Sequence, residues 1–142
     1  IRARRFSGEH RGFTLAVVVW LEVGDVARFP RPDMLATYAG TTPRLNQSGK
    51  KKRHRCMGPV RRDVNQFLKW AYVEAANVIC VHQNNWPHRH VVRRYNRIKQ
   101  RRGHGKAIVA VARHLAEATW HILTKQQPYR DPNSSAGLSR GA

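Results

Sequence analysis

One short stretch of this sequence combines a small hydroxyl side chain, a glycine and a run of positive charge. Ser48 and Gly49 are followed directly by Lys50, Lys51, Lys52, Arg53, His54 and Arg55. Glycine lets a backbone approach a ligand closely, and lysine and arginine attract a phosphate and stabilise the charge that develops on it. The Ser48 hydroxyl in this setting suits a nucleophile that attacks a phosphodiester. Serine and glycine are also common turn residues, so the stretch taken alone fits a solvated basic turn better.

The charge of the whole chain favours a polyanionic partner. Its 142 residues contain 27 Lys and Arg against 8 Asp and Glu, a formal net charge of +19. No acidic residue occurs over residues 34–62 or 75–116, whereas a generic solvated surface mixes both signs. We therefore expect the chain to bind nucleic acid through these two regions. The candidate contacts are Lys50, Lys51, Lys52, Arg53, Arg55, Arg61, Arg62, Arg93, Arg94, Arg97, Arg101, Arg102 and Lys106.

Tyr95 lies among the arginines of the second region and allows two interpretations. One is that its ring stacks on an exposed base, as aromatic side chains do in proteins that bind single strands. The other places it on the buried seam of a helix with Val91 and Ile98, and the helical spacing favours this second interpretation.

The sequence disfavours several other kinds of site. A two-metal nuclease needs carboxylates that converge on its cations, and the eight acidic residues are scattered along the chain. The cysteine and histidines between residues 80 and 90 do not match a common zinc spacing, so we expect this chain to bind no metal. The longest apolar run, residues 15–21, is too short to span a membrane. Two cysteines cannot form a disulfide framework, which indicates a reducing cytosol.

Hydrophobic periodicity predicts a mainly α-helical fold. Residues 12–23 are apolar nearly all round, which is typical of a buried helix, although successive valines also tolerate a strand. Asp33 is placed to cap a short second helix. Apolar residues recur at i, i+3, i+4 and i+7 over residues 64–79 and predict the best-defined helix of the sequence. A strongly basic helix over residues 91–102 and an alanine-rich helix over residues 106–123 complete the set.

These elements predict one compact helical domain whose first two helices resemble a helix-hairpin-helix, a common way to grip a DNA backbone. Residues 41–59, between the second and third helices, indicate a basic loop. Since the sequence starts with Ile1, we expect a fragment of a longer protein, with residues 1–11 as a basic N-terminal remnant. We expect the domain to cover residues 12–125 and a disordered tail to cover residues 126–142.

A series of short motifs follows a characteristic order along the chain. The motifs are EVGDVARF at residues 22–29, LATYAGTTP at 35–43, Ser48-Gly49, GPVRRDVNQFLKWA at 58–71, AIVAVAR at 107–113 and QPY at 127–129. In this order the chain resembles the C-terminal domain of the insertion-sequence-110/116/902 family of transposases. The segment at 58–71 is similar to the family's Gly-x-Ile-Thr-Lys-x-Gly-Asn-x-x-Leu-Arg motif, although Val64-Asn65 stands where the family has Gly-Asn.

The resemblance implies a DNA recombinase built from two parts. In the family, an N-terminal RNase H-like domain holds divalent metal, usually magnesium, and the C-terminal domain supplies a serine that becomes covalently linked to DNA. By motif that serine is Ser48, with Gly49 and Asn65 expected to position its loop. The implied partners are DNA and a structured guide RNA, and we expect a homo-oligomer when the protein is full length. The implied location is the bacterial cytoplasm, in association with the nucleoid.

We therefore expect the serine-bearing domain of a transposase, inactive unless joined to an upstream metal-binding domain. The alternative is a non-catalytic nucleic-acid-binding protein from a truncated or degenerate transposase copy. The two hypotheses differ in their need for Ser48. An enzyme loses its chemistry when this serine is replaced, whereas a passive binder loses affinity only when its basic side chains are replaced.

Overall fold

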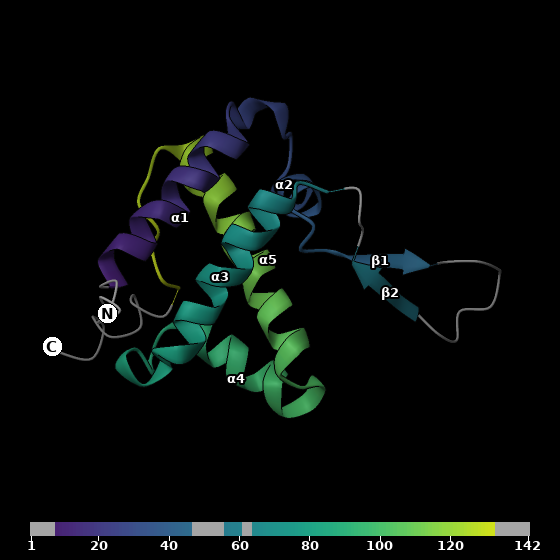
Figure 1. Ribbon diagram of the computed structural model, residues 1–142, viewed down its shortest axis with the longest axis vertical. Helices are drawn as coiled ribbons and strands as arrows, with labels where there is room; N and C mark the ends of the chain where they lie inside the picture. Colours follow the sequence, from purple (N-terminus) through teal and green to yellow (C-terminus); the bar gives the residue numbers. More distant parts are fainter. Residues whose placement is uncertain (1–7, 47–55, 61–63, 133–142) are drawn as a thin grey trace, which may run out of the picture.

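The computed structural model describes residues 8–46, 56–60 and 64–132, with side chains described at 12–42 and 64–132. Within these ranges the chain is mainly α-helical, as the sequence predicts (Figure 1). The elements in chain order are α1 (Gly8–Val23), η1 (Val26–Arg28), α2 (Pro32–Tyr38), β1 (Pro43–Asn46), β2 (Cys56–Val60), α3 (Gln66–Val81), η2 (Gln83–Asn85), α4 (His90–Arg102) and α5 (His104–Lys125).

Helix α5 is the scaffold of the fold, because α2, α3 and α4 all pack against it. Its buried side is made of small residues, and Ala107, Ala112 and Ala116 have no exposed surface. Alanine at these positions lets the neighbouring helices approach α5 closely. The core between the helices contains Val23, Leu35, Leu68, Tyr72, Tyr95, Ile108 and Val111.

Helix α1 is only half buried, although its sequence is apolar nearly all round. It packs against α3 and buries Leu15 and Val23 on that side. On its outer side Phe13 is 73% exposed and Trp20 is 66% exposed. The expectation of a fully buried first helix is therefore wrong, because no described element covers the outer side of α1.

Helix α2 begins differently from the prediction. Its first residue is Pro32, which suits the first helical position, and the N-cap is Arg31, without a side-chain hydrogen bond to the helix. Asp33 lies inside the first turn, where its carboxylate forms an ion pair with Arg31 at 2.8 Å. Its own carbonyl oxygen accepts a 2.8 Å hydrogen bond from the hydroxyl of Thr37. Asp33 is therefore not the cap. Helices α1 and α2 are present in the expected order, and they pack on different helices, α3 and α5.

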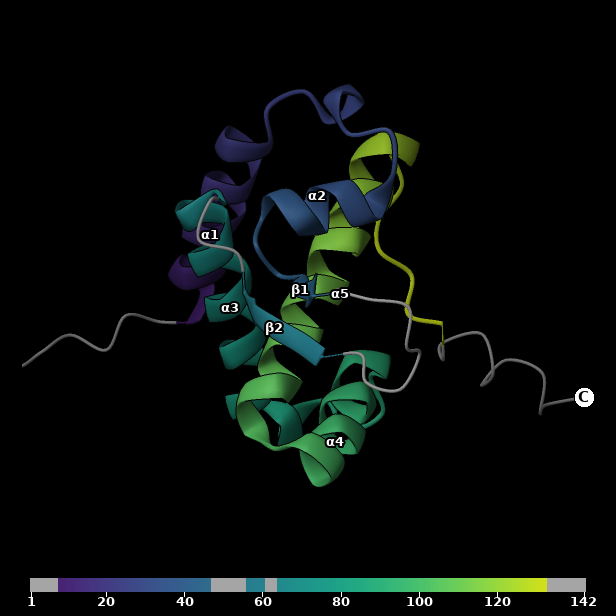
Figure 2. The same cartoon turned by 90° about the vertical axis from the view of Figure 1, so that its right-hand side faces the viewer.

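The predicted basic loop is bounded by two short strands. β1 and β2 pair antiparallel, with Pro43 opposite Val60 and Asn46 opposite Cys56, and the register shifts between residues 43 and 45. Figure 1 shows this pair projecting to one side of the helical body, and Figure 2 shows it from that side, in front of the helices. The prediction of loop structure throughout residues 41–59 is thus wrong at both ends of the segment.

The chain after α5 returns along the helical body. Helix α5 ends where Gln126 adopts a left-handed conformation, with φ 51°. The segment up to residue 132, in yellow in Figure 1, then brings Asp131 to the first turn of α4, where its carboxylate accepts a 3.0 Å hydrogen bond from the backbone N–H of His90. The predicted tail began at residue 126, and its last ten residues, 133–142, lie outside the described ones. None of the helices that the structure describes is both long and apolar enough to cross a bilayer.

Candidate nucleic-acid interface and catalytic segment

Both ends of the segment that carries the two strands are held close together. Before β1, Gly40 has φ +65°, and a Cβ atom there would lie 2.5 Å from Cγ2 of Val64, which follows β2. Thr41 is 2% exposed, and both its backbone N–H and its hydroxyl donate to the carbonyl oxygen of Ala36, at 3.0 and 2.8 Å. Residues 40 and 64 are therefore in close contact, and this contact depends on the absence of a side chain at Gly40.

Asn65 joins three helices at this point. Its Oδ1 accepts a 3.0 Å hydrogen bond from the backbone N–H of Leu68, which caps α3. Its Nδ2 donates to Oε2 of Glu22 at 2.6 Å and to Oη of Tyr38 at 3.4 Å. Its backbone N–H donates to the carbonyl oxygen of Tyr38 at 3.1 Å. The end of α1, the end of α2 and the start of α3 thus meet at one side chain.

Aromatic and cationic side chains support Tyr38 from the other side. The guanidinium of Arg28 lies 5.0 Å from the centre of the Tyr38 ring and 4.9 Å from that of Phe29. The hydrogen bond from Asn65 lowers the pKa of Tyr38. The indole N–H of Trp120 donates to the carbonyl oxygen of Phe29 at 2.7 Å, which ties this corner to α5. We call the contacts of Glu22, Arg28, Tyr38, Gly40 and Asn65 the hinge-end network.

The predicted nucleophile and its neighbours are outside the described residues. Ser48, Gly49, Lys50, Lys51, Lys52, Arg53, Arg55, Arg61 and Arg62 all belong to this group. The strands bound residues 47–55 at Asn46 and Cys56, which lie opposite each other. Opposed residues in an antiparallel pair have Cα atoms about 4.5–5.5 Å apart, so the nine-residue connection starts and ends at adjacent points.

The second group of predicted basic residues forms an exposed face on α4 and the start of α5. Arg93, Arg97 and Arg101 recur every four residues and are exposed on the side opposite to buried Val91 and Tyr95. The remaining members of the group differ in exposure. Arg102 and Lys106 are exposed, whereas Arg94 is half-buried. We call Arg93, Arg97 and Arg101 the α4 arginine row.

Tyr95 lies on the buried seam of α4, which decides between its two interpretations. The side chain is 3% exposed, and its hydroxyl is 2.7 Å from Nδ1 of His104. The interpretation in which this ring stacks on an exposed base is therefore wrong, because the ring is buried in the described structure. Cys80 is buried in the same core, and burial raises the pKa of its thiol. Within the described ranges, no three His, Cys, Asp or Glu side chains gather where they could hold a metal ion.

A polar cluster lies where α4 meets α5. The rings of His90 and His114 are 5.3 Å apart, and Nε of Arg94 is buried without a hydrogen-bond partner among the described residues. The pKa of His114 is lowered, first by burial and then by the positive charge of Arg94 and by His90, against smaller raising effects of Glu117 and Asp131. Burial and the neighbouring positive charge therefore disfavour the protonated form of His114 in the folded state.

Sequence reasoning missed most of the hinge-end network. It identified Asn65, but not Glu22, Tyr38 or Gly40 as its neighbours. A glycine directly after a short helix is a signal for positive φ, and it would have pointed to Gly40. No local signal identifies Glu22, because its partner is 43 residues away in the chain.

Comparison with known proteins gives two matches. The family model described as "Transposase IS116/IS110/IS902 family" matches residues 11–92, which include the hinge-end network and both strands. The transposase for insertion sequence element IS1111A from Coxiella burnetii (strain RSA 493 / Nine Mile phase I) is 30% identical over 119 residues. That alignment covers 84% of this chain and 32% of the relative, so the chain spans about a third of the relative's length. No solved structure shows significant similarity to the chain.

Proposed function

The chain belongs to the IS116/IS110/IS902 family of transposases, and on this premise we propose that it binds DNA and supplies Ser48 as the nucleophile for strand cleavage and rejoining. The observation that carries the proposal is the hinge-end network. It fixes the two ends of the segment that contains Ser48 to the helical body through Asn65 and the contact between Gly40 and Val64. A nucleophile works best when the chain on both sides of it is held in place.

The α4 arginine row supports the DNA-binding part of the proposal. Arginine side chains four residues apart on an exposed helix face can contact successive phosphates. No acidic residue between 75 and 116 offsets their charge. In this proposal the α4 arginine row positions the DNA backbone, and the basic residues next to Ser48 contact the phosphate that reacts. A structured guide RNA is a further proposed ligand of these basic surfaces.

The proposed chemistry is a reversible exchange of phosphoesters. The Oγ atom of Ser48 attacks a phosphorus atom of the DNA backbone and gives up its proton. A bond from phosphorus to Oγ forms, the bond from phosphorus to an oxygen of the leaving strand breaks, and the proton goes to that oxygen, which becomes the strand's free hydroxyl. The covalent intermediate conserves the phosphodiester linkage, so a second strand hydroxyl can reverse the step and join a new partner.

Magnesium is proposed for another part of the full-length enzyme. The resemblance implies that an RNase H-like domain holds it, and the described residues of this chain offer no cluster of three or more suitable ligands. The metal would stabilise charge on the transferring phosphate. What the residues of this chain would do is hold the segment, attract the DNA and deliver the serine hydroxyl.

The nucleophile is tested by trapping the covalent intermediate. The chain is fused to the RNase H-like domain of a full-length relative and incubated with that relative's element-end DNA and Mg²⁺. We expect a DNA–protein adduct that survives boiling in detergent, and we expect Ser48→Ala to abolish it. Ser134→Ala is the matched control and should leave the adduct unchanged. An undiminished adduct in Ser48→Ala would rule out this assignment.

The same variants separate an enzyme from a passive binder. Ser48→Ala should bind duplex DNA within about twofold of the unsubstituted chain, because a neutral hydroxyl contributes little to phosphate affinity. Replacing the α4 arginine row by alanine should weaken binding strongly. If the row is replaced and DNA affinity does not change, α4 is not the DNA-binding face.

A further inference from the structure

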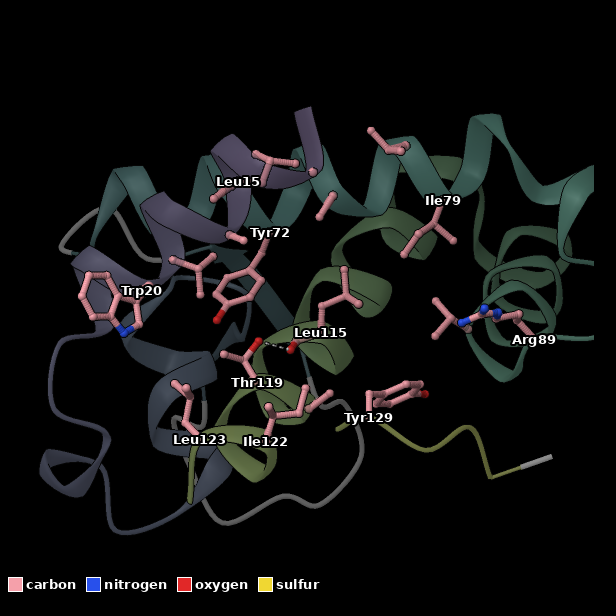
Figure 3. A pocket seen from close by; sticks show the side chains of 18 of the residues that line it. Leu15, Trp20, Tyr72, Ile79, Arg89, Leu115, Thr119, Ile122, Leu123 and Tyr129 are labelled. Carbon is pink, nitrogen blue, oxygen red and sulfur yellow. Dashed lines mark hydrogen bonds between the residues drawn. The ribbon is translucent and has the colours of Figure 1, made fainter. Parts of the chain in front are cut away.

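A tryptophan is exposed in the turn between α3 and α4, at one end of an apolar groove. Trp86 and Arg89 both line this groove, which lies between α1, α3 and α5. Figure 3 shows Arg89 at the end of the groove opposite to Trp20. Trp86 is 43% exposed, so a large part of its side chain remains available to a ligand. We call Trp86 and Arg89 the turn pair.

Backbone hydrogen bonds hold the turn pair in a fixed arrangement. The N–H of Trp86 donates to the carbonyl oxygen of Gln83 at 3.2 Å, which closes η2. The carbonyl oxygen of Trp86 accepts a 3.1 Å hydrogen bond from the N–H of Arg89, and Pro87 is the second residue of this turn. The proline ring fixes φ at that position. An aromatic side chain on so constrained a turn is preorganised for binding, because little freedom is lost when a ligand arrives.

The surroundings of the turn pair suit an anionic ligand with a flat aromatic part. The Cζ atom of Arg89 lies 5.8 Å from the centre of the Trp86 ring, near the outer limit of about 6 Å for a cation–π contact. No acidic residue occurs over residues 75–116. Asp131 reaches this end of α4 from the C-terminal segment, but its carboxylate already accepts a 3.0 Å hydrogen bond from the backbone N–H of His90. The turn thus combines an exposed aromatic ring with an excess of positive charge.

The other exposed tryptophans lack this combination. Trp20 is 66% exposed, on a stretch of α1 without charged side chains. Trp70 is 52% exposed, and Glu74 follows it one turn later on α3. Among the cation–π contacts in the described part of the chain, the one that involves a tryptophan is that of Arg89 with Trp86.

The turn pair also lies next to the α4 arginine row. The N–H of Arg93 donates to the carbonyl oxygen of Arg89 at 3.1 Å, so these residues are one helical turn apart, about 6 Å along the axis. A strand whose phosphates contact the row would therefore reach Trp86 with a neighbouring nucleotide. Tyr95, for which the sequence allows base stacking, is buried, whereas Trp86 offers an exposed ring in the same acid-free region.

We propose that the turn pair is a binding site for an unpaired base of a single-stranded nucleic acid. The base stacks on the exposed indole of Trp86, and the phosphate of the same nucleotide contacts Arg89. A paired base cannot take this position, because its faces are covered by its neighbours in the duplex. The site therefore selects single strands and bases that have left the duplex. The inference rests on the proposed binding of nucleic acid, but it requires neither Ser48 nor its chemistry.

The test compares two single strands that differ only in their bases. A fluorescently labelled oligothymidylate and an abasic strand of the same length carry the same phosphates, and each is titrated with the 142-residue chain at one fixed salt concentration. We expect fluorescence anisotropy to show about tenfold tighter binding of the strand with bases, the effect of one base stacked on an aromatic ring. Trp86→Ala should remove this preference and change affinity for the abasic strand by less than about twofold. Trp70→Ala is the matched control, since Trp70 is also exposed, and it should retain the preference.

Two further variants keep the result interpretable. Trp86→Phe should retain most of the preference, because phenylalanine also offers an aromatic face. Circular dichroism shows whether each variant is folded, and Trp86→Leu replaces Trp86→Ala if the alanine variant does not fold, because leucine retains an apolar side chain at the groove. Equal affinity of the unsubstituted chain for the two strands overturns the proposal. So does a preference that survives the loss of the Trp86 ring, and so does an equal loss in Trp70→Ala.

Two additional ligands identify the strand and separate this inference from the proposed function. Oligouridylate is compared with oligothymidylate, and the strand that loses more affinity in Trp86→Ala is assigned as the ligand of the site. A DNA duplex should bind Trp86→Ala and the unsubstituted chain within about twofold of each other, because its bases are already stacked. If the duplex binds through the α4 arginine row and neither single strand shows a base preference, this inference alone fails. If the unsubstituted chain binds neither duplex nor single strand, the proposed binding of DNA fails with it.

Discussion

The side-chain amide of Asn65 donates a 2.6 Å hydrogen bond to the carboxylate of Glu22, which lies 43 residues earlier in the chain. The same Asn65 side chain caps α3 through its other atom, Oδ1. One residue therefore starts a helix and fastens it to the end of α1. Two separate contributions to stability follow, and substitutions can distinguish them.

Asn65→Ala should destabilise the fold by about 1–2 kcal/mol through loss of the cap, with a further loss because the Glu22 carboxylate loses its donor. Asn65→Asp retains the cap acceptor but removes the amide donor and places two carboxylates together, so its cost reports on the contacts of Nδ2 with Glu22 and Tyr38. Urea denaturation measures both. Asn96→Ala, on the exposed side of α4, is the control and should change stability by less than about 0.5 kcal/mol. If Glu22→Gln fails to restore stability to Asn65→Asp, the link is not energetically important.

Gly40→Ala should be more damaging than Gly24→Ala. Both glycines have positive φ, +65° and +58°, so either alanine costs about 1–2 kcal/mol in backbone strain. Only at Gly40 would the new Cβ also meet a neighbour, Cγ2 of Val64 at 2.5 Å. Thermal unfolding of the two variants measures the difference. Adding Val64→Ala should recover part of the loss in Gly40→Ala, and equal melting temperatures for the two glycine variants would contradict the close contact.

Arg97→Ala should weaken DNA binding and reduce its dependence on salt. Each phosphate contact contributes about 0.9 to the slope of log K against log salt, so removal of one arginine should lower the slope by about 1. Fluorescence anisotropy with a labelled duplex at several salt concentrations gives the slope. Asn96→Ala, one residue away on the same helix, should leave it unchanged. An unaltered slope in Arg97→Ala would show that this side chain makes no phosphate contact.

His114 should make the fold less stable in mild acid. Its pKa is lowered in the folded state by burial, by Arg94 and by His90, so the unfolded chain binds the proton more readily. The stability is fully present above the unfolded pKa of about 6.5 and is lost as the pH falls from there toward the lower folded pKa. Denaturation in urea across this range should show the loss, and His114→Gln should reduce it. A pH profile identical in His114→Gln would assign the effect to other groups.

Two buried tyrosines should respond oppositely to loss of their hydroxyls. The hydroxyl of Tyr72 has no hydrogen-bond partner among the described residues, and burial raises its pKa to about 12, so Tyr72→Phe should be neutral or stabilising by about 1 kcal/mol. The hydroxyl of Tyr95 is paired with His104 at 2.7 Å, so Tyr95→Phe should destabilise by a similar amount. Chemical denaturation of the isolated monomer measures both. A loss of stability in Tyr72→Phe would mean that its hydroxyl is paired in solution.

The helices could be predicted from the sequence because their apolar residues repeat with the helical period. The prediction of a helix over 64–79 corresponds to α3 at Gln66–Val81, and that over 91–102 corresponds to α4 at His90–Arg102. The strands could not be predicted, since β1 and β2 contain four and five residues without apolar alternation. The contact between residues 40 and 64 brings the two ends of this segment together, which is a tertiary feature that no local sequence pattern shows.

The candidate site could be predicted only in part, because several of its contacts join residues far apart in the sequence. The order of motifs identified the family. Among the arginines of α4, Arg94 is half-buried, and the others are exposed. The partners of Asn65 could not be deduced, because they lie 43 and 27 residues earlier. A helix that is apolar on all sides, such as α1, also gives no indication of which side a neighbour will cover. The roles of Ser48 and Gly49 stay predictions, since both lie outside the described residues.

The hinge-end network also has a consequence for the order of folding. Contacts between residues so distant in sequence require a large loop to close, so they form only after the flanking helices have docked. The chain on either side of Ser48 therefore gains fixed ends late, when α1, α2 and α3 are already assembled. A newly synthesised or partly denatured copy lacks that arrangement. Under the proposed function, the fold would thus restrict the Ser48 nucleophile to molecules that have finished folding.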